Sequence, residues 1–131
     1  MSLVFPNIGT EKILDFLVAN SMSLKLFSNN IVPAITDVLA TYTEVVGGGY
    51  AAITLAPANW TTTAASPSIA LYNALQQFSF TGATNPPGTI YGYYIVQGAN
   101  LICAERFPAG EVPFTPQAGS YIRLRPRISC V

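Results

Sequence analysis

The segment that decides the fold class is IYGYYIVQGANLICAERF, residues 90–107 of a chain of 131 residues. Its two halves, residues 90–96 and 101–107, are rich in the apolar, aromatic and β-branched residues that favour strands. Between them lies Gln97-Gly98-Ala99-Asn100, which has the length and the glycine of a hairpin loop. This segment therefore predicts two neighbouring antiparallel strands joined by a loop of four residues.

Short strands separated by turn signals are expected along most of the remaining chain. Leu24 and Leu26 alternate with Ser23 and Lys25, which is the period of a strand. Gly47-Gly48-Gly49 interrupts the pattern and supplies freedom in φ for a turn or a bulge. Further strands are expected at residues 41–46, 50–55, 59–63, 68–72 and 75–81, with connecting loops at residues 31–40, 85–88 and 108–119.

One helix is expected near the start of the chain. Thr10 is placed to cap it, and Ile13, Leu14, Leu17 and Val18 form an apolar stripe with helical spacing. The apolar segment at residues 2–6 precedes this helix and has no core of its own, so we expect it to be an arm that lies on a neighbour. The expected organisation is an N-terminal arm of residues 1–9 and one β-rich domain of residues 10–131. The expected fold class is mainly β, a β-sandwich or jelly-roll-like domain with one short N-terminal helix.

Residues 121–128 alternate more regularly than any other segment. Read as one strand, they place Ile122, Leu124 and Ile128 on one face and three arginines on the other, about 7 Å apart. Three such charges serve phosphate binding, pairing with carboxylates, or a solvated face. A neutral chain without a wider basic field argues against a nucleic-acid partner. Pairing with Glu105 or Glu111, or with a neighbouring subunit, and a plain solvated face are the readings left open for Arg123, Arg125 and Arg127.

Charged residues are scarce in this chain. They make up 9% of it, six acidic and six basic, where about 25% is typical of a soluble domain. One explanation is a surface rich in hydroxyl and amide side chains, which is common in β proteins. The other is a surface covered by protein partners, because the centres of interfaces are depleted in charge.

The sequence offers little for catalysis. It has no histidine, the commonest general base and zinc ligand. Its carboxylates lie on separate expected elements, and Glu11 and Asp15, one helical turn apart, are explained by a solvated helix face. Cys103 and Cys130 are too few for a disulfide framework and are read as reduced, mostly buried thiols, although pairing stays open. We expect no enzyme, no catalytic residue, no cofactor and no metal site.

Tyrosines gather on the segment that decides the fold. Tyr91 and Tyr93 share one face, and Tyr94 takes the other. Tyrosine suits protein interfaces because it buries a large area and keeps a polar handle. The same residues suit stacking on carbohydrate, and core pairs across strands are an equally good reading. No apolar run reaches the roughly 18 residues that a membrane helix needs, so we expect no membrane partner.

A set of short phrases spread over most of the chain is distinctive, although no single phrase is a catalytic signature. The phrases are residues 24–30 (LKLFSNN), 43–45 (TEV), 47–51 (GGGYA), 55–60 (LAPANW), 78–82 (FSFTG), 90–96 (IYGYYIV), 104–107 (AERF) and 113–115 (PFT). With these phrases the chain resembles a family of small phage and prophage proteins of similar length.

The resemblance implies a virion structural protein. Within that class we expect a capsid cement protein that forms a homo-oligomer, usually a trimer, and binds the major capsid protein on the capsid surface. A tail or fibre module that binds a receptor or glycan is the alternative, and a hydrolase that uses a carboxylate is a third class without a substrate to propose. The residues expected to contact partners are Leu3, Val4, Phe5, Tyr91, Tyr93, Arg123, Arg125 and Arg127.

Overall fold

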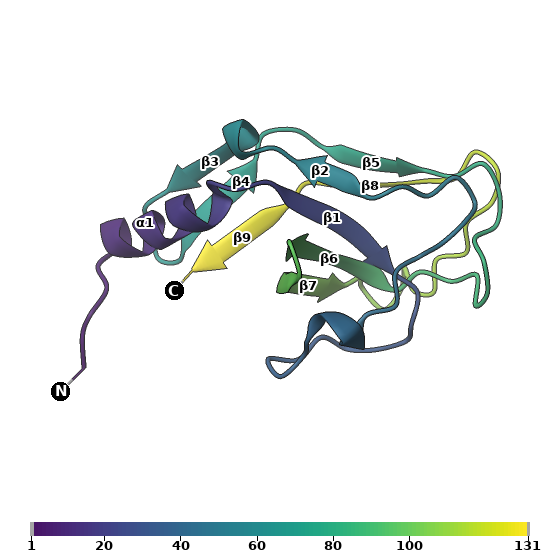
Figure 1. Ribbon diagram of the computed structural model, residues 1–131, viewed down its shortest axis with the longest axis horizontal. Coiled ribbons are helices and arrows are strands. Elements are labelled where there is room, and N and C mark those ends of the chain that lie inside the picture. The colour runs from purple at the N-terminus through teal and green to yellow at the C-terminus, as the bar shows by residue number, and fades with distance from the viewer. Residues whose placement is uncertain (1, 131) are drawn as a thin grey trace. The chain divides into compact units, whose positions relative to one another are not determined.

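The computed structural model describes residues 2–130, and within them the chain forms one α-helix, two short 3-10 helices and nine strands (Figure 1). The strands form antiparallel sheets, which confirms the expected fold class: mainly β and β-sandwich-like, with one N-terminal helix. The elements are α1 (Asn7–Val18), β1 (Met22–Phe27), η1 (Leu39–Thr41), β2 (Ile53–Leu55), η2 (Pro57–Asn59), β3 (Trp60–Thr63), β4 (Ser68–Tyr72), β5 (Gln76–Ser79), β6 (Gly92–Gln97), β7 (Asn100–Arg106), β8 (Tyr121–Leu124) and β9 (Arg127–Cys130).

The described chain divides into two compact units that interleave along the sequence. Unit 1 contains residues 2–22, 55–76 and 124–130, and unit 2 contains residues 23–54 and 77–123. The expected arm of residues 1–9 and single domain of residues 10–131 stay a prediction. Helix α1 nevertheless begins at Asn7, so only residues 2–6 precede it without regular secondary structure.

In unit 1, helix α1 packs on a three-stranded sheet of order β3-β4-β9 (Figure 1). The face of α1 toward the sheet buries Leu14 and Val18 of the predicted apolar stripe, whereas Ile13, which was predicted to share that stripe, is 44% exposed. The prediction that Thr10 caps the helix is wrong. Pro6 occupies the N-cap position, and its carbonyl accepts bonds from the N–H groups of Gly9 and Thr10. Thr10 lies inside the first turn, where its hydroxyl donates to the Asn7 carbonyl at 2.9 Å, a bond that threonine makes within helices.

In unit 2, the main sheet has the order β2-β1-β6-β7. Strand β1 pairs antiparallel with β6 from Ser23 opposite Val96 to Phe27 opposite Gly92. The β6–β7 hairpin predicted by the sequence is present, with Gln97 opposite Asn100. Its loop is therefore two residues rather than four. Strands β5 and β8 form a separate two-stranded sheet.

An aromatic cluster forms the core beneath the β6–β7 hairpin. Phe27, Tyr42, Tyr94 and Val96 are buried together, and the rings of Tyr42 and Tyr94 stack with centroids 5.2 Å apart. Gly92 lets β6 approach this cluster. A Cβ atom at this position would lie 2.1 Å from the Glu105 carbonyl oxygen and 2.6 Å from the Phe27 ring. A glycine at residue 92 is therefore required by close packing.

The strand expected at residues 41–46 does not form. Glu44 makes only an isolated bridge with Phe27, although backbone bonds join Ser28 to Thr43 and Val45 to Leu26. The three glycines at residues 47–49 all have φ between +62° and +82°, a region that other residues rarely adopt. They turn the chain away immediately after the bridge, which ends the pairing.

Residues 121–128 are two strands, and the prediction of a single strand is wrong. Strand β8 pairs with β5, and β9 pairs with β4. Pro126 lies between them and has no N–H to continue a ladder, while its carbonyl accepts a bond from the Tyr72 N–H at 2.9 Å. The alternation of exposed and buried residues continues through the break, so all three arginines are still exposed.

Candidate functional site

Exposed apolar side chains gather at the start of the chain. Leu3, Val4 and Phe5, all predicted to contact partners, are 89%, 86% and 61% exposed. Phe16, on the face of α1 opposite the buried stripe, is 82% exposed, and Ile8 is also exposed. We name these five residues the N-terminal apolar surface. An interface role was predicted for the arm residues, whereas Ile8 and Phe16 were not among the residues predicted to contact partners.

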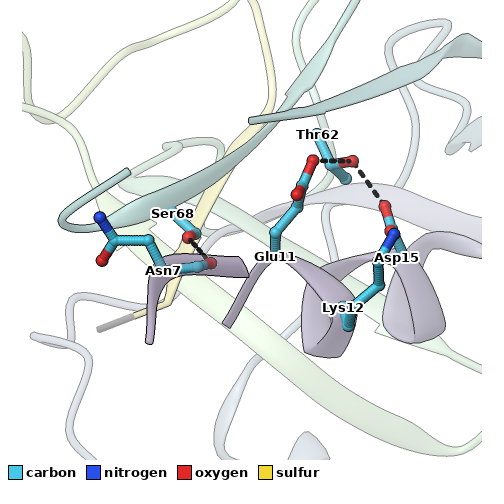
Figure 2. A network of polar contacts seen from close by, with 6 residues as sticks. All are labelled: Asn7, Glu11, Lys12, Asp15, Thr62 and Ser68. Carbon is cyan, nitrogen blue, oxygen red and sulfur yellow. Dashed lines mark hydrogen bonds and ion pairs between the residues drawn. The ribbon is translucent and has the colours of Figure 1, made fainter. Parts of the chain in front are cut away.

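The flank of α1 that faces β3 carries a polar network with that strand (Figure 2). Asp15 and Glu11 both point toward Thr62, whose hydroxyl lies 2.5 Å from Asp15 Oδ1 and 3.4 Å from Glu11 Oε1. One hydroxyl proton serves one acceptor at a time, and Asp15 is the nearer. The Thr62 bond, with help from Lys12, lowers the pKa of Asp15 below its usual value. The solvated helix face expected for the two carboxylates is thus a contact between α1 and β3.

A second link under α1 is buried. The Ser68 hydroxyl lies 2.6 Å from that of Thr10, 3.0 Å from the Asn7 carbonyl and 3.1 Å from the Ala65 carbonyl. It also accepts a bond from the Ala65 N–H. These contacts are with other hydroxyls and backbone groups, none of which acts as a general base at neutral pH. The cluster fastens the helix to β4, and its arrangement is that of a structural link.

The two tyrosines predicted to contact partners have partners inside the chain. Arg106 lies over the Tyr91 ring, 5.0 Å from its centroid, and Tyr91 packs on the aromatic cluster. Tyr93 donates a hydrogen bond of 2.5 Å to Glu105, and its ring packs near that of Phe107. Burial, and then the Glu105 carboxylate, raise the pKa of Tyr93 well above its usual range. Both tyrosines are half-buried, so they stabilise unit 2 whatever else they contact.

Trp60, the one tryptophan of the chain and by its chemistry a candidate for stacking on a glycan, is only 9% exposed. Its ring meets that of Tyr72 edge-on, with centroids 5.1 Å apart. A buried indole cannot offer its face to a sugar without a local rearrangement of the sheet. The aromatic composition that suggested carbohydrate binding is, at this position, part of the core of unit 1.

The arginines differ in how the fold uses them. In unit 2, Arg123 donates to Gln77 at 2.6 Å and lies over the Tyr121 ring. In unit 1, Arg125 donates to the Tyr72 carbonyl at 2.7 Å and to the Asn73 carbonyl at 3.3 Å. Arg127 pairs with Leu71 through the β4–β9 ladder, but its side chain is exposed, and no hydrogen bond or ion pair joins that side chain to another residue in the described range 2–130. The three arginines therefore do not act as one stripe, because the contacts of their side chains differ.

Ion pairs within residues 2–130 use lysine alone. Lys12 pairs with Asp15, and Lys25 pairs with Glu44, both at 3.1 Å. No arginine in this range has a carboxylate within ion-pair distance, so the predicted pairing of arginines with Glu105 or Glu111 of the same chain does not form.

A concave pocket of about 410 Å³ lies in unit 2, between β7 and the loop that precedes η1. Asp37 stands in it, with Oδ2 accepting a bond of 2.7 Å from the Tyr42 hydroxyl and one of 2.9 Å from the Ala34 N–H. These two bonds lower the pKa of Asp37 below its usual value, so the carboxylate is ionised at neutral pH. The lining residues are Pro33, Ala34, Ile35, Asp37, Tyr42, Leu101, Ile102, Cys103 and Ala104.

Sequence reasoning treated Asp37 only as one carboxylate in a loop. The pocket depends on packing that loop against a strand more than sixty positions later in the chain, and no local pattern reports such a contact. The one local signal is an aspartate five residues before a tyrosine, within an otherwise apolar loop. That signal is common in proteins and would not by itself have identified a pocket.

Cys103 and Cys130 are free thiols, and both are half-buried. Burial, and then the nearby Glu105 charge, raise the pKa of Cys103 to about 11, which makes its thiol a poor nucleophile at neutral pH. Residues 2–130 contain no group of three or more side chains placed to hold a metal ion. No helix in the same range combines the length and the apolar character that a membrane crossing requires.

Comparison of the chain with protein-family models, with curated proteins and with solved structures finds no match in any of the three.

Proposed function

We propose that this protein is a non-enzymatic structural subunit that associates with copies of itself and with a larger assembly. The observation that carries the proposal is the N-terminal apolar surface, which exposes two aromatic and three aliphatic side chains in one segment of the chain. Apolar surface removed from water contributes about 25 cal/mol per Å². Extended apolar exposure is uncommon on monomeric proteins and marks interaction sites.

Charge supports the same proposal. The chain is neutral and only 9% of its residues are charged, so little repulsion opposes the approach of a second copy. Four arginines lack a carboxylate partner within residues 2–130, while several carboxylates accept only from neutral groups. A surface with unpaired charges of both signs and equal number is suited to pairing with a copy of itself.

Within this class we favour a capsid cement protein of a tailed phage, which the sequence resemblance implies. A cement protein forms an oligomer, in most cases a trimer, on the major capsid protein and adds buried surface between capsid subunits. A standard specific interface buries about 1,600 Å² in total. Repetition at many equivalent positions converts modest contacts into strong binding through avidity.

The proposal is tested by removing the N-terminal apolar surface without touching the core. Deletion of residues 2–5, which keeps the Pro6 carbonyl that caps α1, and the substitution Phe16→Ser change only exposed groups, so both variants should unfold at the same denaturant concentration as the parent chain. We expect each to weaken self-association and to reduce retention on purified phage particles in co-sedimentation. Leu75→Ser, which changes an exposed leucine elsewhere in unit 1, is the matched control and should change neither.

The outcomes separate the alternatives. Weakened association together with lost capsid retention supports the cement function. Retention on tails or fibres in place of capsids moves the subunit to another part of the virion. Unchanged association in both the deletion and the Phe16→Ser variant contradicts the proposal.

A further inference from the structure

The pocket between β7 and the loop before η1 has the size and lining of a binding site. Ligand pockets range from about 300 to 1,000 Å³, and the volume of about 410 Å³ falls within that range. Its walls come mainly from apolar residues, among them Ile35, Leu101 and Ile102.

Asp37 is the charged group in the lining, and the fold orients it in advance. Both hydrogen bonds that it accepts, from Tyr42 and Ala34, fall on Oδ2. No described residue donates to Oδ1, which leaves half of the carboxylate available to a ligand. A carboxylate held in one position by two donors loses little further entropy when it binds a cation. The pocket is therefore built for a cationic group carried on an apolar stem.

The chain itself supplies a group of this chemistry. An arginine side chain joins a planar guanidinium to an apolar stem and pairs closely with a carboxylate. Arg106, Arg123 and Arg125 already donate to oxygen atoms within their own units. Arg127 is exposed and has no such partner among residues 2–130. It is the arginine that can enter a partner's pocket without giving up a bond.

We propose that Asp37 of one copy binds the guanidinium of Arg127 from a second copy, with the arginine stem against the apolar walls of the pocket. The pairing rests on the proposed function, because it identifies one contact of the self-association. Each chain then carries one donor and one acceptor, so the contact either repeats around a closed ring or occurs twice across a two-fold axis. In a ring of three, each interface contains one such pair.

Charge reversal tests the pairing. Asp37→Arg and Arg127→Asp should each raise the dissociation constant of self-association by about 10-fold to 100-fold, as measured by sedimentation velocity. The double variant Asp37→Arg/Arg127→Asp should restore most of the loss, because the charges again face opposite charges. Glu111→Arg, which reverses an exposed carboxylate outside the pocket, is the matched control and should have no such effect.

Local damage to the loop is a competing cause for the Asp37 variant, because Asp37 accepts two bonds there. Arg127→Asp is free of that concern, since Arg127 makes no contact of this kind in the described chain. Arg127→Lys keeps the charge but loses the planar fork, and should weaken association less than Arg127→Asp.

The possible results distinguish the pairing from the wider proposal. A parent chain that stays a single chain at every concentration overturns both. A parent chain that associates, with single reversals that associate equally well, overturns the pairing alone. Single reversals that weaken association without any recovery in the double variant also overturn it, since two independent contacts would then explain the losses.

Discussion

Two groups of residues that were expected to contact partners, the arm residues Leu3, Val4 and Phe5 and the tyrosines Tyr91 and Tyr93, are treated differently by the fold. Tyr91 and Tyr93 are half-buried inside unit 2. Arg106 lies over the Tyr91 ring, and the Tyr93 hydroxyl donates a hydrogen bond to Glu105. The three arm residues are exposed over most of their surface. Residue chemistry shows which side chains suit an interface, whereas only the fold shows which of them are already engaged.

The same difference between engaged and exposed residues holds for the two faces of helix α1. Its inner face is fastened by Leu14, by Val18 and by the Ser68 hydroxyl, while its outer face presents Phe16 to solvent. Changes on engaged surfaces should therefore alter stability, and changes on exposed surfaces should alter association. Four substitutions or reactions, taken from the largest expected effect to the smallest, test that division.

The largest effect is expected at Gly92, which lies between the two tyrosines and faces the aromatic cluster of unit 2. Gly92→Ala places a methyl group within 2.1 Å of the Glu105 carbonyl oxygen, and neither that backbone nor the packed Phe27 ring has room to move. We expect a loss of at least about 3 kcal/mol in the free energy of unfolding, measured by urea denaturation. Gly82→Ala is the matched control, because nothing lies within 4 Å of its added carbon. Equal stability of the two variants would contradict the close packing at β6.

A smaller loss is expected at Ser68, on the inner face of α1. Ser68→Ala removes the hydroxyl that Thr10 contacts and leaves the Ala65 N–H without its acceptor. Leaving buried groups unpaired costs about 1–3 kcal/mol. Ser129→Ala, at an exposed position on β9, provides the control. If urea denaturation finds both variants as stable as the parent, the hydroxyl cluster does not fasten the helix.

Tyr93→Phe should have a modest effect that depends on pH. Removing the bond to Glu105 costs roughly 1 kcal/mol or less at neutral pH, and association should not change. Burial raises the pKa of Tyr93 in the folded chain, so the unfolded chain ionises first, near pH 10. The parent chain therefore loses stability relative to Tyr93→Phe as the pH rises beyond that value. A stability difference that stays constant from pH 7 to pH 11 would argue against the buried phenol.

The smallest structural disturbance is chemical modification of Cys103, which lies on β7 near Tyr93. Its pKa of about 11 leaves little thiolate at pH 8.5, whereas an unfolded cysteine is about half ionised there. Alkylation by iodoacetamide at pH 8.5, followed by mass spectrometry, should be on the order of 100-fold slower at Cys103 in the folded chain than in urea. Similar alkylation rates in the folded chain and in urea would show that the fold does not shield the Cys103 thiol.

Local patterns in the sequence predicted much of the fold. Alternation located β1, and glycine between two apolar runs located the β6–β7 hairpin. The errors occurred where a single residue overrides a pattern. Pro126 divides residues 121–128 into strands of different sheets, and Pro6 starts α1 ahead of the expected Thr10 cap.

Less of the candidate site could be predicted. The arm was accessible to sequence reasoning, because an apolar segment ahead of a helix has no core of its own. The engagement of Tyr93 by Glu105 depends on strand register, and the Asp37 pocket depends on how a loop packs against β7. Both are long-range contacts, which neither composition nor periodicity specifies.

The account depends most on the claim that the N-terminal apolar surface is covered by protein when the chain is at work. Sedimentation velocity of the unmodified chain over a wide range of concentrations tests this most directly. We expect the weight-average mass to rise from that of one chain to a defined oligomer, and the rise to be lost when residues 2–5 are deleted. A single chain at every concentration that also fails to bind virus particles would contradict the central claim.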